Sequence, residues 1–171
     1  MRGVFDLSGK VALVTGAGQN VGAGIARALA AQGAAVAVND LVADRAESTV
    51  AAVRAAGGRA ELAVFDVTNG DAVAAGVEAV TATLGPVDIL VNNAGVPAGM
   101  RPVQFRNLPR EEWDRYVDLN IYGSLNCVAA VIDGMCERRW GRVVQISSGA
   151  GRTGLRMGIS LYGASKSGVD R

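Results

Sequence analysis

The chain has 171 residues, half of them hydrophobic, which is enough for one domain with a sizeable core. Its 17 basic and 16 acidic residues give a formal net charge of +1, and the scattered arginines do not form the clustered basic face that nucleic-acid binding needs. The chain has no histidine, which excludes histidine-dependent triads, a histidine general base and histidine-ligated metal sites. Acid–base chemistry must come from Asp, Glu, Tyr, Lys or Cys.

The first half of the chain predicts three buried strands that alternate with three helices. Short apolar runs indicate the strands, and apolar residues at helical spacing indicate the helices. The predicted strands are residues 10–16, 34–40 and 60–67, and the predicted helices are residues 21–33, 44–58 and 71–85. Asp44 and Glu47 stand three residues apart at the front of the second helix, which predicts a capping box there.

The second half continues the alternation. It predicts a strand and turn at 87–95, a loop to about 108, a long helix from Pro109 to about Arg138, a strand at 142–148, a glycine-rich loop at 149–158 and a last helix that begins near Tyr162. Strands buried on both faces need helices on both faces of a parallel sheet. Right-handed crossovers then produce a doubly wound, Rossmann-like α/β fold with five strands, and residues 1–171 are expected to form one domain.

The cysteines and the amino terminus indicate a compartment. Cys127 and Cys136 are expected on one helix, roughly 13 Å apart, which is too far for a disulfide. Two unbridged thiols are typical of a reducing cytoplasm. The first ten residues do not resemble a signal peptide, and no run of about 18 apolar residues predicts a membrane span.

A glycine-rich turn at 15–24, TGAGQNVGAG, lies between the first predicted strand and helix. In that position a dinucleotide pyrophosphate would meet helix N–H groups. Asp40 ends the second strand, where a carboxylate can accept hydrogen bonds from adenosine ribose hydroxyls and repel a 2′-phosphate. Asp66 and Asn93 follow later strands, at the sheet edge where ligands bind in such folds. The alternative is a tight turn that binds no ligand.

Tyr162 and Lys166 stand four residues apart in the sequence LYGASK, so they share one face of the predicted helix. A neighbouring ammonium favours the phenolate form of tyrosine, which makes the phenol a competent acid–base group. The alternative is a chance pair on a surface helix.

In order along the chain, these motifs resemble the short-chain dehydrogenase/reductase family. The matching motifs are TGAGQNVG at 15–22, Asp40, Asp66 with Val67, NNAG at 92–95, Asn120, ISS ending at Ser148, and YGASK at 162–166. The resemblance implies hydride transfer between NAD(H) and a small secondary alcohol or ketone. NADP is less favoured, because Asp40 would repel the 2′-phosphate and no arginine follows it immediately.

The resemblance also implies residue roles. Tyr162 would be the acid–base group, Ser148 would hydrogen-bond the substrate oxygen, Lys166 would hold the nicotinamide ribose, and Asn120 would support a water relay to Lys166. The implied cofactor-binding residues are Gly16, Gln19, Asn20, Val21, Gly22, Asp40, Asp66, Val67, Asn93, Tyr162 and Lys166. The alternative for Asn120 is an internal hydrogen bond that braces its helix. No metal site is expected.

The chain departs from the family pattern at two places. Asn20 stands where the family usually has a glycine, but asparagine tolerates a positive φ, so the turn can survive. The family also continues past the last helix, with further strands and much of the substrate pocket. We therefore expect a chain that is incomplete at its carboxyl terminus, with the fifth strand at a sheet edge. A full-length protein would be a homo-oligomer.

Two other readings stay open beside the enzyme. One is a nucleotide-binding module without catalysis, and the other is an inactive truncated fragment. Arg152 and Arg156 flank the presumed active-site loop, where they would recognise an anionic substrate group or, as the favoured reading, belong to a solvated loop.

Overall fold

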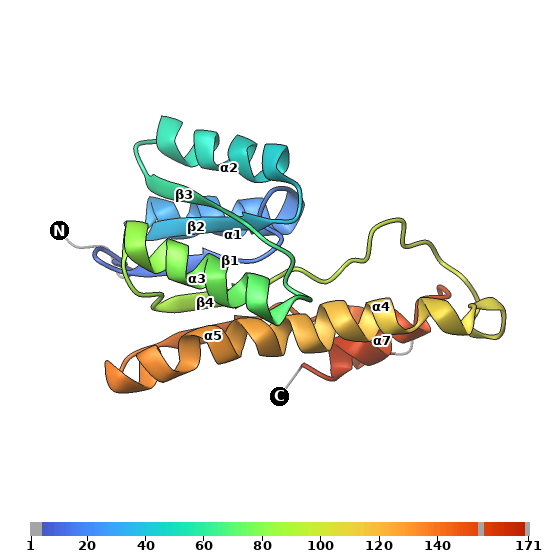
Figure 1. Cartoon of the computed structure of the whole chain (residues 1–171). Helices are drawn as coiled ribbons and strands as arrows, with labels where there is room; N and C mark the ends of the chain where they lie inside the picture. Colours follow the sequence, from blue (N-terminus) through green and yellow to red (C-terminus); the bar gives the residue numbers. More distant parts are fainter. Residues whose placement is uncertain (1–4, 154–155, 170–171) are drawn as a thin grey trace.

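A computed structural model describes residues 5–153 and 156–169 (Figure 1). The first seven elements are β1 (Val11–Val14), α1 (Asn20–Ala31), β2 (Ala35–Asp40), α2 (Ala43–Ala55), β3 (Arg59–Val64), α3 (Gly70–Leu84) and β4 (Ile89–Asn92). They are followed by η1 (Phe105–Asn107), η2 (Arg110–Glu112), α4 (Asp114–Val117), η3 (Asp118–Tyr122), α5 (Gly123–Glu137), β5 (Arg142–Gln145), α6 (Gly149–Arg152) and α7 (Ser160–Ser167).

The five strands form one parallel sheet in the order β3-β2-β1-β4-β5. The order turns back at β1, so that β2 and β4 flank the first strand. This arrangement confirms the predicted doubly wound, Rossmann-like fold. In such sheets the crevice at the carboxyl ends of the strands, beside the turning point, is the place where ligands bind.

Alternating side chains of the strands build a core on each face of the sheet. Leu13 and Leu90 pack with residues of α3 and α5, including Val77 and Val131. Val14 and Val38 pack on the opposite face with residues of α1 and α2. Figure 1 shows α3 in front of the sheet and α1 behind it. Because β1 and β2 are covered on both faces, every residue of these two strands is buried.

The long helix predicted from Pro109 to Arg138 is not continuous. It begins with the 3₁₀ turn η2, continues through the single turn of α4, widens into the π-helical segment η3 and only then becomes α5. Side chains inside the segment bond to main-chain oxygens: the Asn120 amide donates to Tyr116 O (3.2 Å) and Ser124 Oγ to Asn120 O (2.8 Å). Such local bonds compete with the regular helix ladder. The widened turn places Asn120 in the interior.

Two local predictions were wrong. The N-cap of α2 is Val42, with no side-chain capping bond, and Asp44 lies inside the first turn, so Asp44 and Glu47 form no capping box. Asp40 Oδ1 accepts from the Val42 N–H (3.0 Å), which directs the chain into the helix earlier than the spacing suggested. The loop predicted at 149–158 contains the short helix α6, and its residues 154–155 lie outside the described part of the chain.

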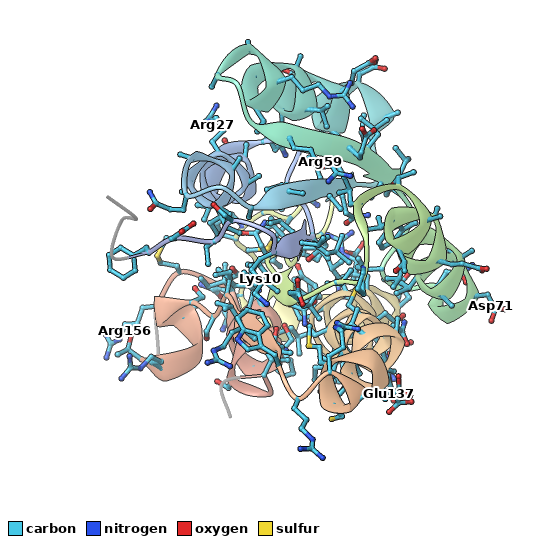
Figure 2. All side chains as sticks on the ribbon, turned by 90° about the vertical axis from the view of Figure 1, so that its left-hand side faces the viewer. Lys10, Arg27, Arg59, Asp71, Glu137 and Arg156 are labelled. Carbon is cyan, nitrogen blue, oxygen red and sulfur yellow. The ribbon has the colours of Figure 1, made fainter. Side chains whose placement is uncertain are left out.

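The expected position of the fifth strand at a sheet edge is confirmed. β5 pairs only with β4, and Val143 and Val144 are 39% and 43% exposed. Both cysteines lie on α5 and are unbridged, as expected; Cys127 is buried and Cys136 is exposed. Figure 2 looks at the amino-terminal ends of the strands, where Lys10 lies near the centre of the sheet and stacks over the Trp140 ring (3.8 Å from Nζ to the centroid).

Among the residues that the structure describes, one segment, Arg110–Glu137, is long and apolar enough to cross a membrane by length and composition alone. The sequence had predicted no such span. In the structure Cys127, Val131 and Met135 of this segment are buried in the core with residues of α3. Core helices of soluble proteins pass the same test of length and composition.

Candidate active site

The glycine turn after β1 is pressed against the end of β4. Gly16 has φ +58°, and a Cβ at this position would lie 2.9 Å from the Ala94 Cα. Gly22, in the first turns of α1, is closer still: its Cβ would lie 2.3 Å from Gly16 O and 2.5 Å from the Asn93 amide nitrogen. Both positions therefore require glycine, and the turn is closed tightly at the mouth of the sheet.

Asn20 adopts the left-handed conformation, with φ +49°. This confirms that the turn accommodates asparagine where the family usually has glycine. Gln19 is the N-cap of α1 in an extended conformation, and it makes no side-chain capping bond. The first turn of α1 carries no acidic residue, and Val21 is exposed there. A helix terminus of this kind offers N–H groups and a positive dipole end to an anion.

Asp40 is almost completely buried and is already bonded to the glycine turn. Its Oδ2 accepts from the Gly18 N–H (3.1 Å) and its Oδ1 from the Val42 N–H (3.0 Å). A carboxylate has about four acceptor positions, so these two bonds leave capacity for ribose hydroxyls. The sequence did not reveal that the Asp40 carboxylate, which is expected to bind the ribose, also fixes the glycine turn through Gly18.

Asn93 links the fourth strand to the glycine turn. Its amide donates to Thr15 O (2.9 Å) and Gly16 O (3.0 Å), and its own N–H donates to Thr15 Oγ1 (3.0 Å). Thr15 Oγ1 also accepts from the Ala94 N–H (3.1 Å). Asn93 thus fixes the shape of the glycine turn. The turn, together with Asn93 and Ala94, is called the cradle below. Thr15, which shares this task, was missed in the sequence, although it stands at the start of the TGAGQNVG motif.

Asp66 and Val67 follow β3 at the same edge. Asp66 Oδ1 accepts from the N–H and hydroxyl of Thr68 (2.9 and 2.8 Å), which fixes the turn. The Val67 side chain is buried and faces Gly123, where an added Cβ would lie 2.9 Å from a Val67 methyl group. A ligand contact from Val67 would therefore come from its main chain.

Ser148 and Lys166 both lie beside the end of β5. Ser148 is the N-cap of α6, and its Oγ accepts from the Ala150 N–H (3.2 Å). Tyr162 and Lys166 stand one turn apart on α7, as predicted. The Lys166 side chain is 4% exposed, and its ammonium donates to Ile146 O (2.8 Å). A second bond, from Ser147 Oγ to Lys166 O (3.5 Å), helps to tie α7 to the strand.

Gly95 is where three parts of the chain meet. A Cβ on Gly95 would lie 2.3 Å from Lys166 Nζ and 2.5 Å from Asn120 Oδ1. Asn120 is 1% exposed, and its Oδ1 has no hydrogen-bond partner among residues 5–153 and 156–169. The structure therefore brings Asn120 and Lys166 together, while the amide nitrogen makes the internal helix bond to Tyr116. Gly95 was not singled out in the sequence, although the NNAG motif contains it.

Burial excludes one other titratable group from acid–base chemistry. Burial raises the pKa of the Cys127 thiol to about 12, so this thiol stays protonated at neutral pH. The described residues contain no group of three Asp, Glu or Cys side chains placed to hold a metal ion.

Comparison with known proteins agrees with this geometry. The family model for short chain dehydrogenases matches residues 10–171. The chain is 45% identical to glycine betaine reductase ATRR of Emericella nidulans, over 94% of the chain but 12% of that protein. It is 39% identical to gluconate 5-dehydrogenase of Gluconobacter oxydans, over 97% of the chain and 63% of that protein.

Solved structures are similar as well. A gluconate 5-dehydrogenase from Burkholderia cenocepacia, in complex with NADP and tartrate, has a TM-score of 0.87 at 34% identity, with 96% of this chain and 63% of that chain covered. A 7α-hydroxysteroid dehydrogenase in complex with NADH and 7-oxo glycochenodeoxycholic acid has a TM-score of 0.88 at 33% identity, with 96% and 62% covered. The chain thus spans less than two thirds of the length of these relatives. Because the family model matches residues 10–171 and the curated and solved relatives are more than 30% identical over nearly the whole chain, the chain belongs to the short-chain dehydrogenase family.

Proposed function

We propose that this chain carries the dinucleotide site and the proton-transfer residues of an NAD(H)-dependent oxidoreductase that interconverts a small secondary alcohol and a ketone. One observation carries the proposal above the others. The buried ammonium of Lys166 lies one helical turn from Tyr162 and meets Asn120 over Gly95. A merely structural surface helix has no use for a lysine that is buried in this way, since burying an ammonium costs free energy.

The nicotinamide group, when bound, supplies or accepts the hydride at the substrate carbon. Tyr162 gives a proton to the carbonyl oxygen during reduction and removes the hydroxyl proton during oxidation. Lys166 favours the phenolate form of Tyr162 and holds the nicotinamide ribose. Because the Ser148 oxygen accepts from the Ala150 N–H, its hydroxyl proton can be donated to the substrate oxygen.

The cofactor half of the proposal rests on the cradle around the glycine turn. The turn at the amino terminus of α1 would hold the pyrophosphate through Gly16, Gln19, Asn20, Val21 and Gly22. Asp66 and Val67 border the cradle, to which Asn93 belongs. Asp40 receives the ribose hydroxyls and repels a 2′-phosphate, so NAD is preferred over NADP. Arg45, on α2, is the first arginine after Asp40 in the sequence, and an added Cβ on Gly18 would lie 2.6 Å from the Arg45 Cβ.

Asn120 connects Lys166 to water in this proposal. Its unpartnered Oδ1 would accept from a water molecule that in turn contacts the Lys166 ammonium. Along this route the proton that Tyr162 gives up during reduction is replaced, and the proton that it takes up during oxidation is released. The alternative role as a helix brace uses only the amide nitrogen, so both roles are compatible with the observed bond to Tyr116.

We also propose that the protein works as a cytoplasmic homo-oligomer without a membrane or nucleic-acid partner. Tyr122, Leu125 and Ile132 are exposed on one stripe of the long helix, three and seven residues apart. An apolar stripe of this kind suits a second copy of the chain. Both cysteines are unbridged, which is compatible with a reducing compartment.

Gly95→Ala tests the observation that carries the proposal. The added methyl group displaces Lys166 or Asn120, so we expect turnover of alcohols with NAD to fall while calorimetry shows nearly unchanged NAD binding at the adenosine half. Gly24→Ala is a matched control, because it makes the same change at a glycine that, like Gly95, has no positive φ, and nothing lies within 4 Å of the added Cβ. If Gly95→Ala keeps full activity, the contact is not part of the site.

Residues 1–171 alone are expected to bind NAD with little turnover, since α7 has only eight residues and follows an exposed strand. Turnover assays beside a longer form of the protein measure this difference. Bound NAD without any reduction of ketones in either form would favour the non-catalytic binding module instead.

A further inference from the structure

The arginines of the two loops beside Ser148 and Tyr162 are not compensated by acids. Residues 89–109 contain no Asp or Glu and carry Arg101 and Arg106. Residues 143–169 contain no Asp or Glu and carry Arg152, Arg156 and the buried Lys166. The chain as a whole is nearly balanced, with 17 basic and 16 acidic residues. The positive charge is therefore concentrated in the segments that follow β4 and precede α7.

The structure joins these two segments. The Val103 N–H donates to Gly158 O (2.7 Å), and a Cβ on Gly158, which has φ +67°, would lie 2.8 Å from the Val103 carbonyl carbon. Arg101 and Arg156 each stand two residues from this contact, which is at most about 7 Å along the chain. Loops of separate origin thus bring Arg101 and Arg156 to one rim.

The rim lies next to the proposed catalytic residues. Arg152 ends α6, four residues after Ser148, which is about 6 Å along a helix. The Val103–Gly158 contact comes directly before α7, four residues ahead of Tyr162.

None of the four guanidinium groups is engaged elsewhere. Within residues 5–153 and 156–169 they have no ion-pair or hydrogen-bond partner, and all four residues are exposed. By contrast, Arg54, Arg110 and Arg115 pair with Glu61, Asp114 and Glu112. Figure 2 shows Arg156 projecting outward beyond the ribbon rather than back toward the sheet. Unpaired guanidinium forks match the geometry of a carboxylate.

We propose that the substrate of this site is anionic: a small hydroxy acid or keto acid whose carboxylate is recognised at the rim by Arg101, Arg106, Arg152 and Arg156. This inference rests on the proposed oxidoreductase function and adds its substrate class. The arginines act in binding, because they lie outside the reacting centre. Their effect appears in KM and is screened by salt, while kcat changes little.

A charge-matched substrate pair tests the proposal. 3-Hydroxybutanoate and its methyl ester contain the same secondary alcohol and differ by one charge. We expect the acid to have a KM about tenfold lower at low salt, and the difference to shrink as salt is added. Arg152→Gln and Arg156→Gln should each raise the KM of the acid about threefold and leave that of the ester unchanged, as for exposed ion pairs. Arg27→Gln, which removes an exposed arginine from α1, is the matched control.

A binding measurement makes the result independent of turnover. We expect the guanidinium Nε–H NMR signals of the rim arginines to shift on titration with 3-hydroxybutanoate but not with the ester, while the Arg27 signal stays in place. No selective shift, or equal KM values for acid and ester, would overturn the anionic-substrate inference. Turnover of neutral secondary alcohols alone would overturn it and leave the proposed function intact. A selective shift without turnover of any alcohol or ketone, in the longer form of the protein as well as in residues 1–171, would support the rim and contradict the proposed function.

Discussion

β1 and β5 are both four-residue parallel strands, yet they are held in the fold to different degrees. β1 pairs with two strands and has all four residues buried, whereas β5 pairs only with β4 and has three of its four residues exposed. The glycine turn follows β1, and Ser148 and α7 follow β5. The proposed dinucleotide site is thus built on the core, while the proposed proton-transfer residues follow a strand that is less buried and pairs on one side.

Because β5 is poorly packed, the positions of Tyr162 and Lys166 depend more on hydrogen bonds than on apolar packing. The bonds from Lys166 Nζ to Ile146 O and from Ser147 Oγ to Lys166 O join α7 to the end of β5. Catalytic groups require near-ångström positioning, whereas binding of the adenosine half depends on the buried first half of the sheet. Cofactor binding and turnover should therefore respond to different substitutions.

The largest expected effect is a loss of turnover without a loss of NAD binding, which distinguishes the region after β5 from the region after β1. Tyr162→Phe deletes the phenol hydroxyl and keeps the ring, so kcat should fall by roughly 10²- to 10⁴-fold, the usual contribution of a general acid–base group. NAD binding, measured by calorimetry, should change little. Tyr122→Phe, which removes an exposed phenol from the long helix, is the control. Retention of most of the activity by Tyr162→Phe would exclude the phenol as the acid–base group.

Two substitutions, one in each strand, compare how much β1 and β5 contribute to the free energy of unfolding. Leu13→Ala opens a cavity in a fully buried site of β1 and should lower the free energy of unfolding by about 3 kcal/mol. Val144→Ala removes a half-exposed side chain from β5 and should cost less than about 1 kcal/mol. Urea denaturation of both variants measures the difference. Equal losses would mean that β5 is as well packed as β1.

A substitution at Asp40 sharpens the description of the cradle. Asp40→Asn keeps an oxygen that can accept from the Gly18 N–H and removes the charge, so the glycine turn should persist while the preference for NAD over NADP falls, by about tenfold. The ratio of the two dissociation constants is the measurement. Tighter binding of NADP than NAD by the unmodified chain would already contradict the assigned preference.

The effect that is smallest at neutral pH, because it appears only above about pH 9, concerns Cys127, on the core face of α5. Its pKa is about 12 in the folded state and 9.0 for the free thiol, so between these values only the unfolded state loses the proton. The stabilisation from this group is complete below about pH 9 and falls by about 1.4 kcal/mol per pH unit as the pH rises toward 12. Cys127→Ala should remove this part of the slope of unfolding free energy against pH. The exposed Cys136 serves as the control, since Cys136→Ala should leave the slope unchanged.

Local patterns in the sequence determined the elements of the fold. The apolar runs ending at Gly16 and Asp40 predicted strands because a strand between two layers of helices must be apolar on both faces. The positive φ of Asn20 was foreseeable for the same local reason, since asparagine tolerates this conformation. The order of motifs from the glycine turn to Lys166 predicted the family, and the family model confirms it.

Only the tertiary structure decided how the site is held together. Asp40 bonds to Gly18, Asn93 to Thr15, and Lys166 to Ile146, and these partners stand 22, 78 and 20 residues apart. No local pattern predicts such pairs, because their geometry depends on how the strands are ordered in the sheet. The π-helical turn at Asn120 and the crowding of Gly95 against Lys166 likewise arise where separate segments compete for one space. The sequence by itself predicted which residues would carry the chemistry, and packing between distant segments decided where their side chains meet.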